Sequence, residues 1–144
     1  MRRTWRLGLV ATVAGVAFFL AIVQFGDAAE KGCAQRVPED PSYQVRWSER
    51  PAMDVLGYRL SITRAGRPVT GANVCVNTYM SGMSAMAAAD RAVEVVPGSY
   101  DLELLFEMGG EWLGRVVIAE PGKRTVAVPL SLDVKYTGAM MMMP

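Results

Sequence analysis

Three methionines lie close together in the middle of the chain. Met80, Met83 and Met86 are spaced three residues apart in the segment NTYMSGMSAMAA. A thioether is a soft, uncharged ligand that selects Cu(I) and needs no deprotonation. Three thioethers in one loop therefore predict a weak, exchangeable Cu(I) site. The alternative is that these side chains fill a hydrophobic core as flexible packing groups.

A second group of methionines closes the sequence. Met140 to Met143 form an uninterrupted run before Pro144, and the two groups together hold seven of the ten methionines. A methionine of this tail is a candidate further ligand for Cu(I). The alternative is a disordered tail without a role in binding, as is common at chain ends.

Cys33 and Cys75 are the two cysteines of the chain. Outside the cytoplasm, two cysteines form a disulfide by default. Closing the loop between them stabilises a fold by up to about 4 kcal/mol in the chain-entropy model. The alternative is a pair of thiolates, or one thiol near Met80, that binds a soft metal ion.

Histidine is absent from the sequence. This excludes a Ser-His-Asp triad, a histidine general base and any zinc, haem or copper site with histidine ligands. No other nucleophile stands beside a base, so we expect no enzyme and no catalytic residues. The net charge of +1 gives no electrostatic footprint for nucleic acid, so we expect no nucleic-acid partner.

The N-terminus predicts where the protein works. Residues 1–6 contain three arginines and no acidic residue, and residues 7–23 carry no charge. Such a segment is either an uncleaved signal-anchor that spans the membrane or a signal peptide, with small residues at Gly26 and Ala28 before a cleavage site. In both cases the arginines stay in the cytoplasm and the remainder lies outside it, in the periplasm or extracellular space. We therefore expect a single-pass protein of the cell membrane, or a secreted protein if the signal is cleaved.

Four segments follow from these patterns. Residues 1–29 form the signal-anchor or signal peptide, residues 30–42 a polar linker, residues 43–135 one β domain, and residues 136–144 the Met-rich tail. The division predicts one folded domain beyond the N-terminal segment.

Apolar and polar residues alternate in short runs throughout the β domain, which is typical of strands. We expect about seven strands, a spacing typical of a two-sheet sandwich; they cover residues 43–47, 58–62, 74–76, 92–96, 100–106, 112–118 and 125–132. Gly109-Gly110 is interpreted as a hairpin turn between two of them. The Ala-rich stretch of residues 84–91 predicts at most one helical turn.

Several charged and aromatic residues have ordinary structural interpretations. Glu103, Glu107 and Glu111 are expected on a solvated face, and Trp47 and Trp112 in the core. Asp90 and Arg91 are interpreted as a surface ion pair, which contributes little stability.

Four short motifs follow one another along the chain: GRPVTGANV at residues 66–74, MSGM at 80–83, PGSY at 97–100 and GEW at 110–112. In this order, behind one N-terminal apolar segment, they resemble the YtkA-like/FixH-like family of membrane-anchored or exported domains. The resemblance covers about Tyr43 to Val134. It implies an all-β chain with a single Ig-like β-sandwich behind one N-terminal transmembrane or signal helix.

The resemblance also implies a function. FixH-like members accompany copper delivery to a terminal oxidase, and YtkA-like domains resemble copper-resistance sandwiches. The expected partners are therefore the membrane and a membrane protein such as an oxidase or a copper transporter. Ser81 stands where the family often has proline, and the histidine that often follows the second methionine is missing, so the expected metal is Cu(I) alone.

A second function class remains open on the residues alone. Transthyretin-like and carboxypeptidase-regulatory-like sandwiches share the turn at residues 66–74 but lack the Met loop. By this alternative the domain is an exported protein-interaction module that binds a membrane partner without metal.

Overall fold

The computed structural model of the chain describes Cys33 and residues 36–137. The predicted N-terminal anchor or signal segment and the Met140 to Met143 run lie outside these residues. Within the described part, no helix is both long enough and apolar enough to span a membrane. The chain divides after Ala34 into two units, and the fold below is that of the second unit.

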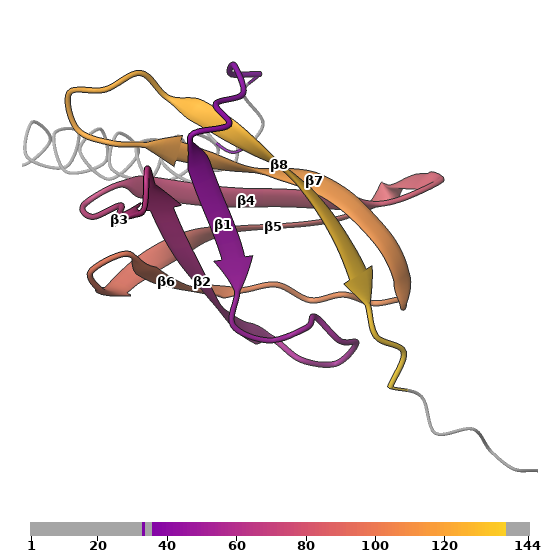
Figure 1. The fold of residues 1–144 in the computed structure, drawn as a ribbon. Coiled ribbons are helices and arrows are strands. Elements are labelled where there is room, and N and C mark those ends of the chain that lie inside the picture. Colours follow the sequence, from indigo (N-terminus) through magenta and orange to yellow (C-terminus); the bar gives the residue numbers. More distant parts are fainter. Residues whose placement is uncertain (1–32, 34–35, 138–144) are drawn as a thin grey trace, which may run out of the picture. The chain divides into compact units, whose positions relative to one another are not determined.

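The β domain consists of antiparallel strands, with no helix in residues 36–137 (Figure 1). Each of the expected strands is present, and a two-residue strand adds to them where a turn was expected. The strands are β1 (Tyr43–Trp47), β2 (Gly57–Arg64), β3 (Arg67–Pro68), β4 (Asn73–Met80), β5 (Met83–Val96), β6 (Ser99–Glu103), β7 (Gly110–Ala119) and β8 (Val126–Val134). The all-β prediction is confirmed.

The strands follow one hydrogen-bonded path in the order β1-β2-β6-β5-β4-β7-β8, with β3 paired to β2. The long strand β5 divides this path. Its first part pairs with β4, as in Cys75 with Arg91, and its last part pairs with β6, as in Val93 with Asp101. We call β1, β2, β3, β6 and the end of β5 the β2 sheet. We call the start of β5 with β4, β7 and β8 the β4 sheet.

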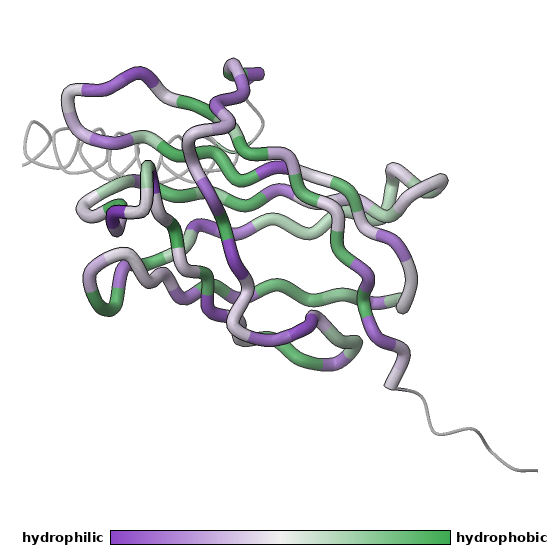
Figure 2. The backbone as a smooth tube through the Cα atoms, viewed as in Figure 1, coloured by the Kyte–Doolittle hydropathy of each residue, from purple (hydrophilic) through white to green (hydrophobic). Residues whose placement is uncertain are grey.

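Inward-facing side chains of both sheets form one core. Polar and apolar residues alternate along β1 in Figure 2, and buried and exposed residues alternate along β2, because successive side chains point to opposite faces. Fully buried members of the core include Leu60, Ile62, Tyr100, Val76 and Val116. The β2 and β4 sheets thus pack face to face, as a sandwich requires.

A row of aromatic rings crosses the core between the two sheets. Ring centroids are 5.4 Å apart for Trp47 and Tyr58, 5.7 Å for Tyr58 and Phe106, and 5.0 Å for Phe106 and Trp112. All three contacts are edge-to-face, the geometry that aromatic pairs prefer. The expected core positions of Trp47 and Trp112 are confirmed.

The Ala-rich residues 84–91, for which at most one helical turn was expected, belong to strand β5. One local prediction was wrong. Gly109-Gly110 does not join a hairpin, because β6 pairs with β2 and β5 whereas β7 pairs with β4 and β8. Residues 104–109 instead cross from the β2 sheet to the β4 sheet.

The two cysteines are joined in a disulfide, as predicted. Cys33 and Cys75 are 5% and 6% exposed. Two neighbours of Cys75 in β4, Val74 and Val76, belong to the core, and Cys75 does not. The sulfurs are therefore bonded to each other, and the alternative of two metal-binding thiolates does not describe this structure.

The two sheets meet along two seams. On the β1 and β8 side, short parallel bridges join Glu39 to Ala127 and Ala52 to Lys135. Backbone hydrogen bonds of 2.8–3.2 Å accompany them, between residues 38–40 and Ala127 and between residues 51–53 and Lys135. We call this the closed seam. On the other side β5 joins β6 from Val93 to Val96, and we call the side of β5 that faces residues 103–107 the open seam.

Candidate functional site

The methionine segment forms the β4–β5 hairpin at the right of Figure 1. Met80 ends β4, Met83 begins β5, and the two are register partners across the turn Ser81-Gly82. Gly82 has a φ of +78°, a left-handed conformation that glycine adopts without steric cost. The turn amide of Ser81 donates to the carbonyl of Glu111 at 2.9 Å, which ties the hairpin to β7.

The three methionines differ in burial. Met80 and Met86 are partly buried against the core, whereas Met83 is 40% exposed. The pairing of β4 with β5 is irregular beside Met80, so regular strand alternation does not assign the faces of Met83 and Met86. Two of the three candidate Cu(I) ligands therefore pack against the core, and the third is the more exposed.

Trp112 accompanies the two inner methionines. It is the register partner of Met80 across β4 and β7, and it lines the same hollow as Met86. The indole Nε1 donates to the carbonyl of Met108 at 3.0 Å, so its polar atom is satisfied. A Cβ added to Gly110 would lie 3.4 Å from Met80 Cε, which places the methyl group against the start of β7.

That hollow opens along the open seam and has a volume of about 380 Å³. Its walls are residues 85–89 of β5 on one side and residues 103–107 on the other, with Trp112 between them. Leu104 and Trp112 are 1% exposed, and Glu103 and Glu107 are exposed. The hollow therefore has an apolar floor and two carboxylates at its rim.

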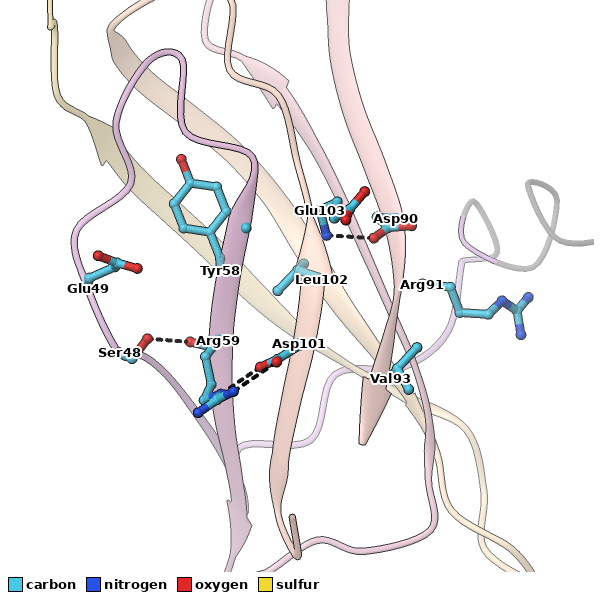
Figure 3. A pocket seen from close by; sticks show the side chains of 11 residues that line it. Ser48, Glu49, Tyr58, Arg59, Asp90, Arg91, Val93, Asp101, Leu102 and Glu103 are labelled. Carbon is cyan, nitrogen blue, oxygen red and sulfur yellow. Dashed lines mark hydrogen bonds and ion pairs between the residues drawn. The ribbon is translucent and has the colours of Figure 1, made fainter. Parts of the chain in front are cut away.

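A larger groove of about 730 Å³ lies on the outer face of the β2 sheet (Figure 3). Arg59 crosses it from β2 to β6, with its Nε and Nη2 donating to the two carboxylate oxygens of Asp101 at 2.6 and 2.8 Å. The hydrogen bond from Arg59 lowers the pKa of Asp101. Both side chains are about half exposed, so the pair contributes little stability.

Asp90 marks the end of the β5–β6 pairing. Its Oδ2 accepts a hydrogen bond of 2.7 Å from the backbone amide of Glu103, and the two residues lie side by side in Figure 3. At this point β5 diverges from β6, and the Asp90 carboxylate accepts the hydrogen bond that a backbone carbonyl of a partner strand would otherwise accept.

The described residues contain no group of three or more histidine, cysteine or carboxylate side chains that could hold a metal ion. A Cu(I) site built from thioethers would not require nitrogen or carboxylate ligands.

The YtkA-like family model matches residues 49–117. This region of the chain is therefore similar to YtkA-like domains. The matched region runs from the start of the β1–β2 connection into β7 and contains the four motifs at residues 66–74, 80–83, 97–100 and 110–112. No curated protein and no solved structure matches the chain.

Sequence reasoning did not find the open seam or the two hollows beside it. The glutamates at 103 and 107 were expected to be solvated, and they are exposed, but their position opposite β5 depends on strand pairing. No local signal marks this edge, because residues 83–89 carry neither the charge nor the proline that natural edge strands usually contain.

Proposed function

We propose that this YtkA-like domain belongs to a non-enzymatic accessory protein that works outside the cytoplasm, anchored by or exported through its N-terminal apolar segment. The expected partner is a membrane protein such as an oxidase or a copper transporter. The strand order supports an Ig-like assignment: β1-β2-β6-β5 and β4-β7-β8 correspond to the ABED and CFG sheets of constant-type immunoglobulin domains. The additional pairing of β5 with β4 links the two sheets.

The accessory role includes weak binding of Cu(I) at the β4–β5 hairpin. The observation that supports it is that Met80 and Met86 share the inner face of the β4 sheet beside Trp112. Two thioethers next to an aromatic face give a soft site that favours a monovalent soft cation. Met83 belongs to the same hairpin, but it is 40% exposed, so we expect the smallest contribution from it.

The test is an anaerobic titration of the full chain with Cu(I) against a competing chelator. A background with Met140 to Met143 replaced by leucine removes the contribution of the tail. We expect one Cu(I) per chain in this background, a loss of binding in Met80→Leu/Met86→Leu, and a smaller effect of Met83→Leu. Met53→Leu is the matched control, since Met53 is also partly buried against the core. Equal Cu(I) uptake by the background and the double variant would refute the site.

A metal-free interaction module is the second candidate function. It is favoured by the open seam, where an apolar hollow with an acidic rim lies beside an unpaired strand edge. Negligible Cu(I) uptake by the unmodified chain would favour this candidate over the copper-binding one.

A further inference from the structure

The first part of β5 has a strand on one side only. Among the described residues, β4 pairs with it from Ala87 to Ala92, and β6 joins only from Val93 onward. An unpaired edge presents a row of backbone donors and acceptors to any extended chain that approaches. Residues 83–89, Met-Ser-Ala-Met-Ala-Ala-Ala, offer neither charge nor proline to prevent such pairing.

Room for another strand exists beside this edge. The hollow of about 380 Å³ separates residues 85–89 from residues 103–107. The segment across the hollow, residues 103–107, already has a hydrogen-bond partner elsewhere: the amide of Leu104 donates to the carbonyl of Leu56 at 2.8 Å. A chain entering the hollow would therefore pair with β5 and would extend the β4 sheet, as in recognition by strand addition.

The charge around the edge indicates what kind of chain fits. The hollow beside β5 and the larger groove on the β2 sheet share Glu103. Together they are lined by five carboxylates and two guanidinium groups, from Glu49, Asp90, Asp101, Glu103, Glu107, Arg59 and Arg91. Arg59 is neutralised by Asp101. At the hollow beside β5 itself, the charged lining residues are Glu103 and Glu107, both exposed. The rim is therefore complementary to a basic ligand.

We propose that the open edge of β5 binds an extended, basic peptide segment of a partner protein, which adds as a strand to the β4 sheet. Backbone hydrogen bonds to β5 supply the pairing. Lysine or arginine side chains that point into the hollow lay their aliphatic stems over Leu104 and Trp112 and bring their charged ends to Glu103 and Glu107. This inference rests on the protein-interaction part of the proposed function and does not require Cu(I), although Met86 and Trp112 of the proposed Cu(I) site also line the hollow.

The test uses the full chain with its disulfide intact, kept in a mild non-ionic detergent. The probe is a decapeptide of alternating lysine and valine. We expect binding by calorimetry, with backbone amide shifts in NMR spectra confined to residues 84–91 and 103–107. Two peptides serve as controls: one with glutamate in place of lysine, and one with the original sequence in which every amide is N-methylated. The N-methylated peptide keeps the charge but cannot donate to a strand.

Variants of the protein separate strand addition from general attraction. Glu103→Lys/Glu107→Lys should weaken binding of the lysine peptide about tenfold, since two attractive contacts become repulsive, and should bind the glutamate peptide instead. Glu111→Lys is the matched control, because this exposed residue lies outside the hollow. Glu103→Gln/Glu107→Gln gives an intermediate affinity if the reversed variant does not fold.

Three results would overturn the proposal: no amide shifts along β5, equal binding of the N-methylated peptide, or equal weakening by Glu111→Lys. Each of these can occur while Cu(I) uptake by Met80 and Met86 persists, in which case the copper-binding function stands and only strand addition fails.

Discussion

The closed seam and the open seam join the same two sheets by different means. At the closed seam, backbone hydrogen bonds connect residues 38–40 to Ala127 and residues 51–53 to Lys135. Side chains add to them: the Tyr43 hydroxyl donates to Glu120 at 2.5 Å, and Arg50 pairs with Asp133. At the open seam, one side-chain contact, Asp90 to the amide of Glu103, extends the β5–β6 pairing.

The difference contrasts an edge that is closed by backbone hydrogen bonds with one that is not. Backbone groups at the closed seam are satisfied within the domain, so that side contributes to stability. Among the described residues, no strand other than β4 pairs with β5 before Val93, and a strand edge of this kind can accept another chain. Buried side chains beneath both seams hold the two sheets together. The β5 edge can therefore be accessible at the open seam while the core stays packed.

The largest expected effect concerns these buried side chains. Phe106 lies in the segment that crosses between the sheets, is fully buried, and contacts both Tyr58 and Trp112. Phe106→Ala should lower the free energy of unfolding by about 3–5 kcal/mol, measured by urea denaturation. Its neighbour Leu105 is 46% exposed, and Leu105→Ala should cost less than about 1 kcal/mol. Similar small losses for the two variants would show that the open seam lacks a packed floor.

The next effect concerns the closed seam at alkaline pH. Burial, together with the hydrogen bond to Glu120, raises the pKa of Tyr43 to about 12, against about 10 in an unfolded chain. The folded state therefore favours the neutral phenol, and this stability is complete below pH 10 and is lost as the pH rises toward 12.

Tyr43→Phe removes this titration, so we expect the free energy of unfolding of the unmodified chain to fall by about 2 kcal/mol more than that of the variant between pH 9 and 12. Burial also raises the pKa values of Tyr58 and Tyr100, but both tyrosines are present in the two proteins and cancel in the comparison. If the free energies of unfolding of the two proteins fell in parallel over this pH range, the buried hydroxyl of Tyr43 would not stabilise the closed seam.

The smallest effect concerns the open seam itself. Asp90→Asn replaces a charged acceptor of the Glu103 amide by a neutral one, which should cost about 1 kcal/mol. Amide exchange should accelerate mainly at the β5–β6 junction, residues 93–96 and 99–103. Asp133→Asn, at the exposed ion pair of the closed seam, is the control and should leave exchange at the junction unchanged. A uniform acceleration across the domain would contradict a local role for Asp90.

Most of the strands could be predicted from the sequence because their aromatic and β-branched residues alternate with polar ones. The start of β5 was missed because alanine and methionine have low β propensity and because its pairing with β4 depends on residues elsewhere in the chain. The misplaced hairpin at Gly109-Gly110 has the same origin: a glycine pair predicts a turn, but it does not say which strands the turn joins.

The arrangement of the three candidate methionines could not be predicted from their spacing. A spacing of three residues suggests a common face in a helix and opposite faces in a regular strand. The methionines instead lie at an irregularity in the β4–β5 pairing, where Met80 and Met83 are register partners. The position of Trp112 beside Met80 arises from the pairing of β4 with β7, which no local pattern reveals.

The contrast between the seams also bears on the order in which the chain folds. The β4–β5 hairpin closes through two residues, Ser81 and Gly82, and hairpins of this kind form in about 1–10 μs. Arg50 and Asp133, at the closed seam, are 83 positions apart, and contacts between distant positions form slowly because the loop entropy must be overcome first. We therefore expect the hairpin that carries the methionines to be an early structure in folding, and the β1–β8 side to be the last part of the domain to close.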